Sequence, residues 1–68
     1  MSDDPLSELC IMIVDDQRAM RMIIRRLLSQ VNIENVIEAE DGREALDYLM
    51  HPSNQTPDLV ICDLHMAN

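Results

Sequence analysis

Three short apolar runs constrain the fold of this chain more than any other feature. They occupy residues 9–14 (LCIMIV), 35–39 (NVIEA) and 58–62 (DLVIC). The first run shows no alternation of polar and apolar residues, which is typical of a strand buried on both faces of a parallel sheet. We therefore predict three short strands, with the first in the most buried position.

The segment after the first run has helical spacing. In residues 17–31 apolar side chains recur at every third or fourth position and predict one apolar helix face, made of Met20, Ile23, Ile24, Leu27, Leu28 and Val31. Arg18, Arg21 and Arg25 fall on another side of this helix, which predicts a solvated basic face. Asn32 is expected to end the helix.

A second helix is predicted between the second and third runs. Asp41 can cap its first turn, and Glu44 stands three residues later, in capping-box register. Pro52 stops the helix, because proline lacks the amide that a helix needs. Its apolar side is predicted to contain Ala45, Leu46, Leu49 and Met50.

The resulting order is strand, helix, strand, helix, strand. This alternation with short connections predicts an α/β fold in which parallel strands are joined by right-handed crossovers. Residues 1–8 are polar and are expected to form a disordered lead-in. The domain itself is assigned to residues 9–68.

Charge and composition exclude several classes of partner. The chain has 13 acidic and 5 basic residues and a net charge of −8, so this segment should repel nucleic acid and anionic membranes. No apolar run is long enough to span a membrane, and the acidic N-terminus is unlike a signal peptide, so a cytoplasmic location is expected. Cys10 and Cys62 lie in apolar runs and are expected to be buried, reduced thiols, a disulfide being the weaker alternative.

Carboxylates follow two of the predicted strands directly. Asp15 and Asp16 come after the first strand, and Asp63 comes after the third. If the first strand lies between the other two, these side chains converge beyond the carboxyl ends of the sheet. A cluster of like charges needs a counter-charge, and Mg²⁺ prefers such oxygen ligands. A carboxylate beside Mg²⁺ can also attack phosphorus and form an acyl phosphate.

The stretches LCIMIVDDQ, AEDGREALDYL and DLVICDLHM, in this order and spacing, resemble the opening, middle and phosphorylation-site segments of bacterial response-regulator receiver domains. The resemblance covers nearly the whole chain. It implies a flavodoxin-like half-domain with three parallel strands in the order 2-1-3 and a helix on each face. It also implies a phospho-accepting module of a two-component signalling system.

The resemblance implies a role for each residue of the acidic cluster. Asp63 would be the phospho-acceptor. Asp16 and Asp63 would bind Mg²⁺, Asp15 directly or through water, and the backbone carbonyl of His65 would complete the set. The phosphoryl donor would be a phosphohistidine on a histidine kinase or a phosphotransfer protein. Such a receiver catalyses only its own phosphorylation and dephosphorylation, so we do not expect an enzyme in the usual sense.

The chain departs from the family pattern in ways that affect function. Ala67 stands where many receivers have proline, and the chain contains no lysine. The family's later hydroxyl residue and lysine, which contact the phosphoryl group, are absent, so we expect impaired phosphotransfer from a truncated receiver. The third strand would then be an apolar edge, which predicts a homodimer paired through it.

Two rival functions remain open. One is a phosphatase with an aspartyl-phosphate intermediate, but such enzymes generally carry a second aspartate two residues after the nucleophile, where this chain has His65. The other is a non-catalytic interaction module that only associates with itself or with partners. Hydrolysis of p-nitrophenyl phosphate would separate the first from a receiver.

Overall fold

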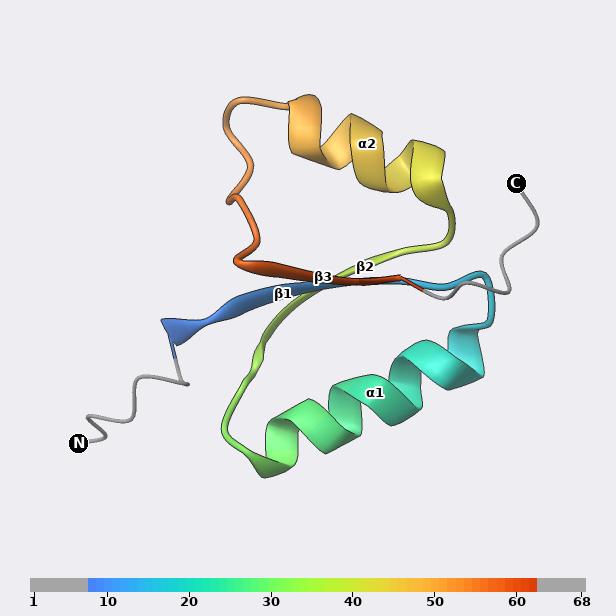
Figure 1. Cartoon of the computed structure of the whole chain (residues 1–68), viewed down its shortest axis with the longest axis vertical. Coiled ribbons are helices and arrows are strands. Elements are labelled where there is room, and N and C mark those ends of the chain that lie inside the picture. Colours follow the sequence, from blue (N-terminus) through green and yellow to red (C-terminus); the bar gives the residue numbers. More distant parts are fainter. Residues whose placement is uncertain (1–7, 63–68) are drawn as a thin grey trace.

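The computed structural model describes residues 8–62 and contains three strands and two helices in that part of the chain. Their order is β1 (Cys10–Val14), α1 (Arg18–Gln30), β2 (Asn35–Ala39), α2 (Gly42–Met50) and β3 (Leu59–Cys62). The strands form one parallel sheet in the order β2-β1-β3, and α1 and α2 lie on opposite faces of it (Figure 1). The predicted α/β architecture, strand order and helix placement are confirmed.

Strand β1 forms the centre of the molecule. All five of its residues are buried, because a strand lies on either side of it and a helix on each face. Met12 and Val14 pack with Ala39 and Ala45 in the core beneath α2. Ile37 and Tyr48 complete this cluster from its margin. The continuous apolar run in the sequence therefore corresponds to a fully buried parallel strand, as expected.

Helix α1 ends in a turn that its sequence predicts. Asn32 adopts a positive φ of 69° and donates its amide to the Ser29 carbonyl at 3.0 Å, while Ile33 donates to Leu28 at 2.9 Å. These two bonds define a Schellman motif with asparagine at the left-handed position, which asparagine tolerates better than most residues. The prediction that Asn32 ends the helix is confirmed.

Helix α2 begins at the predicted cap. The Asp41 carboxylate accepts the Glu44 amide at 2.8 Å. The Glu44 carboxylate in turn accepts the Glu40 amide at 2.7 Å, one residue before the amide used in a standard capping box. The helix ends at Met50, before Pro52. Local sequence signals therefore set both ends of α2.

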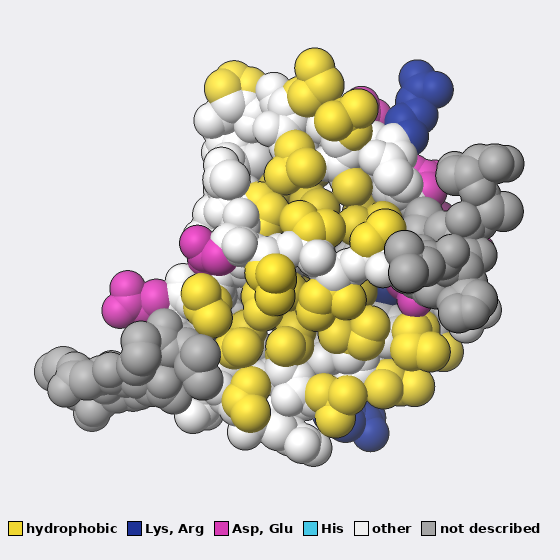
Figure 2. Space-filling model, in the orientation of Figure 1, with side chains coloured by type: hydrophobic (Ala, Val, Ile, Leu, Met, Phe, Trp, Pro, Cys, Tyr) yellow, Lys and Arg dark blue, Asp and Glu magenta, His cyan; other side chains and the backbone are white. Residues whose placement is uncertain are grey.

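The predicted apolar faces of the two helices are only partly buried. On α1, Ile24 and Leu28 are half-buried, whereas Ile23 and Leu27 are more than half exposed. The exposed large apolar side chains form a set that we call the apolar surface: Met20, Met22, Ile23, Leu27, Val31, Leu46, Leu49, Met50, Leu59 and Val60. Figure 2 shows apolar side chains gathered over β3 and over the parts of both helices beside it. A three-stranded sheet is too narrow to cover the whole apolar arc of either helix.

Within residues 8–62, neither helix has the length and apolar character needed to cross a membrane. The predicted lead-in falls almost wholly on residues 1–7, which lie outside the described part of the chain.

Candidate functional site

The first two candidate site residues lie at the carboxyl end of the central strand. Asp15 and Asp16 directly follow Val14, the last residue of β1. The connection from β1 crosses to one face of the sheet and that from β2 to the other (Figure 1). The carboxyl ends of strands at such a switch point are where open α/β sheets bind ligands. The acidic pair therefore occupies the expected ligand-binding edge.

Asp15 is held at three points. Its amide donates to the Ala39 carbonyl of β2 at 3.0 Å, and its carboxylate Oδ1 accepts the Gln17 amide at 2.8 Å. Its backbone carbonyl accepts a hydrogen bond from Nη1 of Arg21. Asp15 is only 1% exposed, so its side chain is a fixed part of the fold and not a solvated loop acid.

Asp16 differs from its neighbour because it is exposed. The N-cap residue of α1 is Gln17. An aspartate that served only to cap this helix would occupy that position, and neither Asp15 nor Asp16 does. The Asp15 carboxylate nevertheless takes up the Gln17 amide. The pair thus combines one buried, oriented acid with one acid open to ligands.

The remaining predicted site residues, Asp63 and His65, lie outside the described residues. The structure does establish how β3, the strand before Asp63, aligns with β1. Val14 of β1 pairs with Cys62 of β3, so these two strands end side by side. Asp15 follows Val14 in the sequence as Asp63 follows Cys62. Among residues 8–62 alone, no group of three potential metal ligands is brought together.

Arg21 corrects the prediction of a solvated basic face on α1. It is 8% exposed, and its Nε donates to Oε1 of Glu38 on β2 at 2.9 Å. Arg25 is half-exposed and binds the other oxygen of the same carboxylate. The hydrogen bond from Arg21, supported by that from Arg25, lowers the pKa of Glu38 against the opposing effect of burial.

Sequence reasoning missed this network, although a signal was present. Arg21 stands three and seven positions before Ile24 and Leu28, the half-buried apolar residues of α1. Residues at that spacing share one face of a helix, so Arg21 belongs to the sheet-facing stripe. Its partner Glu38 comes from another element, and helical spacing carries no information about it.

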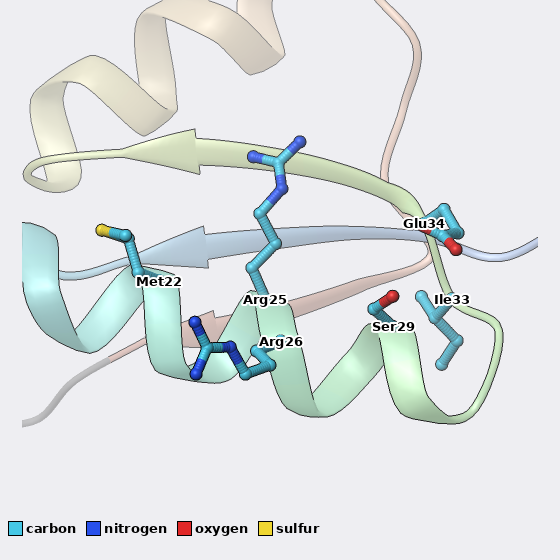
Figure 3. A pocket seen from close by; sticks show the side chains of 6 residues that line it. All are labelled: Met22, Arg25, Arg26, Ser29, Ile33 and Glu34. Atoms are coloured by element: carbon cyan, nitrogen blue, oxygen red, sulfur yellow. The ribbon is translucent and has the colours of Figure 1, made fainter.

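A surface pocket of about 340 Å³ lies along α1, away from the acidic pair. Figure 3 shows its lining residues: Met22, Arg25, Arg26, Ser29, Ile33 and Glu34. Arg25 extends from α1 toward the strands, whereas Arg26 stays beside the helix. The Arg25 guanidinium in this pocket is already engaged by Glu38. The strand ends remain the better candidate site.

The cysteines lie near opposite ends of the sheet, and no disulfide joins them. Cys10 is buried as predicted, and burial followed by the nearby Asp58 charge raises the pKa of its thiol. Cys62 is exposed, contrary to the prediction. The register explains the separation, since Cys10 begins β1 and Cys62 pairs with the last residue of β1.

The donors at the strand ends suit a hard divalent cation. Asp15 and Asp16 supply carboxylate oxygens, one oriented by the Gln17 amide and one accessible. Mg²⁺ binds proteins through one or two carboxylates and keeps several waters, so an incomplete protein shell is what it normally uses. The described residues therefore fit Mg²⁺ in chemical type.

Comparisons with known proteins agree with this fold. The sequence model of the response regulator receiver domain family matches residues 11–68, and the chain belongs to that family. It is 46% identical over 56 residues to the response regulators MprA of Mycolicibacterium vanbaalenii and of Mycobacterium sp. strains KMS and JLS. No solved structure matches the chain at comparable significance.

The match covers 82% of this chain but only 22% of the first of these relatives and 23% of the other two. Receiver domains typically bind Mg²⁺ through acidic residues. In the described part of this chain, Asp15 and Asp16 directly follow β1.

Proposed function

We propose that this chain is a phospho-accepting receiver module acting in the cytoplasm, in which Asp63 takes a phosphoryl group from a histidine kinase or a phosphotransfer protein. The observation that carries the proposal is the position of Asp15 and Asp16 at the carboxyl end of the central strand of a receiver-family sheet. The side-by-side ends of β1 and β3 support the participation of Asp63, which follows β3 in the sequence.

In the proposed reaction, a carboxylate oxygen of Asp63 attacks phosphorus as the phosphorus–nitrogen bond of the donor phosphohistidine breaks. The nitrogen keeps the bonding electron pair, and the product is an aspartyl phosphate. Bound Mg²⁺ would offset charge on the phosphoryl oxygens. Asp15, Asp16, Asp63 and the backbone carbonyl of His65 would be its protein ligands. The chain would turn over no external metabolite.

Metal binding is tested by a Mg²⁺ titration of the melting temperature. A ligand that binds only the folded state stabilises it by mass action, so millimolar Mg²⁺ should raise the melting temperature of the wild type. Asp16→Ala should abolish most of this rise. The matched control is Asp47→Ala, which removes an exposed acid on α2 and should leave the rise intact. Equal responses of the two variants would contradict the site.

Phosphoryl acceptance is tested by incubation with acetyl phosphate and Mg²⁺, followed by intact-mass measurement. These 68 residues contain no lysine to contact the phosphoryl oxygens, so we expect slow and incomplete labelling. The label should disappear in Asp63→Asn. Identical spectra for wild type and Asp63→Asn would contradict Asp63 as acceptor, and rapid complete labelling would contradict the expected impairment.

We also propose that the chain self-associates through the β3 edge as a homodimer. The supporting observation is that Leu59 and Val60 of this outer strand are 55% and 44% exposed. An apolar outer strand offers amides and carbonyls to a second strand, and a two-fold axis would pair β3 with its own copy. Val60→Pro removes one amide donor and should weaken association in sedimentation at several concentrations. A monomer at every concentration would rule the dimer out.

A further inference from the structure

One arginine connects the acidic turn to the rest of the fold. Arg21 and Asp15 are the two buried charged residues in the described part of the chain. The Arg21 guanidinium uses Nη1 for the Asp15 carbonyl and Nε for the Glu38 carboxylate. It therefore bridges the carboxyl end of β1 to β2 from a position on α1.

The bridge acts on the backbone that carries the acidic pair. The Asp15 amide donates to β2, and its carbonyl, one residue past the end of β1, accepts a hydrogen bond from Arg21. That carbonyl belongs to the peptide group linking Asp15 to Asp16. Its orientation therefore limits the directions in which the exposed Asp16 carboxylate can project. The bond from the Gln17 amide to Asp15 Oδ1 closes the same turn.

We propose that Arg21 is a positioning residue that sets the Mg²⁺ affinity of the acidic pair by fixing the Asp15–Asp16 peptide. The proposal rests on the proposed function of that pair as a metal site. Arg21 acts through the backbone carbonyl and contributes no metal ligand. Arginine suits this role because its planar guanidinium presents several donors in a fixed geometry, whereas lysine offers a single mobile ammonium group.

The network contains a matched control. Arg25 binds the same Glu38 carboxylate from the next turn of α1, but it is half-exposed, and its bond runs to Glu38 and not to Asp15. Arg25→Met removes a charge and an ion pair near the site and leaves the bond to the Asp15 carbonyl in place. Arg21→Met removes both bonds of Arg21. Each variant loses one positive charge. A difference between them in Mg²⁺ affinity therefore reports the loss of the bond to the Asp15 carbonyl and the burial of Arg21, and not the change in net charge alone.

The first measurement is the dissociation constant of Mg²⁺ by calorimetry, at a temperature where circular dichroism shows every variant folded. Residues that orient metal ligands typically change affinity 10- to 100-fold, so Arg21→Met should weaken binding at least about tenfold. Arg25→Met should leave affinity within about a factor of two, because the Asp15–Asp16 peptide keeps its partner. Arg21→Lys should recover part of the loss.

The second measurement needs no metal. Amide hydrogen exchange of Gln17 reports the turn itself, with the amides of β1 as the internal reference for global stability. Arg21→Met should raise Gln17 exchange relative to β1, and Arg25→Met should not. Folded Arg21→Met with wild-type Mg²⁺ affinity would overturn the proposal, and so would Gln17 exchange that is unchanged relative to β1.

The two readouts separate this proposal from the proposed function. If the wild type binds no Mg²⁺, both the metal site and the role of Arg21 in affinity are wrong. If the wild type binds Mg²⁺ and Arg21→Met binds it equally well, only the positioning role is wrong. Faster Gln17 exchange and tenfold weaker Mg²⁺ binding in Arg21→Met, with neither change in Arg25→Met, support both the metal site and the positioning role.

Discussion

The two outer strands of the sheet both border Ile11–Val14 of β1 but differ in how they are covered. Ile11 pairs with Val36 of β2 on one side and with Leu59 of β3 on the other. Val36 is half-buried, whereas Leu59 is 55% exposed. On the β2 side, two arginines of α1 reach across to Glu38. On the β3 side, apolar side chains gather over the strand and over the neighbouring parts of both helices (Figure 2).

This difference shows that two strands paired to β1 in the same way can differ in how far their side chains are exposed. Both outer strands are parallel to β1 and similarly aligned with it. The β2 edge is covered because α1 places Arg21 and Arg25 over it and because α2 packs on Ile37 and Ala39. The β3 edge exposes the apolar side chains of Leu59 and Val60. Stability should therefore depend more on side chains at β2 than on those at β3.

The largest expected effect comes from removing the buried arginine. Arg21→Met leaves the Asp15 carbonyl without this donor and leaves Glu38 with only the half-exposed Arg25. We expect the free energy of unfolding to fall by about 2 kcal/mol, below the cost of breaking a fully buried pair because Glu38 is partly solvated. Urea denaturation measures the change. Arg25→Met should cost less than about 1 kcal/mol, and equal losses would show that burial of Arg21 has no special role.

A smaller effect is expected from acid. The pKa of Glu38 is lowered in the folded state from its ordinary value of 4.5, first by the hydrogen bond from Arg21. The stabilisation is therefore complete above the unfolded pKa and is lost as the pH falls below 4.5 through the lower folded pKa. Unfolding free energies measured from pH 6 downward should decline less steeply in Glu38→Gln. Parallel pH profiles for the two proteins would show that the ion pairs on β2 contribute nothing.

The smallest effect is expected at the β3 edge. Val36→Ser and Leu59→Ser alter residues that pair with the same Ile11. The change in half-buried Val36 should cost about 1 kcal/mol, and that in exposed Leu59 less than about 0.5 kcal/mol, at concentrations where the chain is monomeric. Chemical denaturation of dilute samples provides the comparison. A larger loss at Leu59 would mean that the β3 edge is covered in solution.

Local signals in the sequence were enough to predict the secondary structure. The bounds of β2 match the predicted run, and Asn32 and Asp41 mark a helix end and a helix start through their own backbone and side-chain preferences. The buried character of β1 followed from its continuous apolar run. The acidic pair was located because it directly follows that strand. Each of these features depends on residues within a few positions of one another.

Only the tertiary structure decided which side of each helix is covered and which charges are buried. The apolar arc of α1 is wider than the stripe the sheet covers, so the exposure of Ile23 and Leu27 depended on the width of the sheet. The burial of Arg21 depended on Glu38, seventeen residues away on another strand. A buried charge is stable only when it is paired with an opposite charge or a hydrogen-bond partner. For Arg21 that partner lies on another element, so tertiary packing decides whether the two side chains come together. The sequence by itself determined the elements and their order, while the tertiary structure decided which of their side chains share an environment.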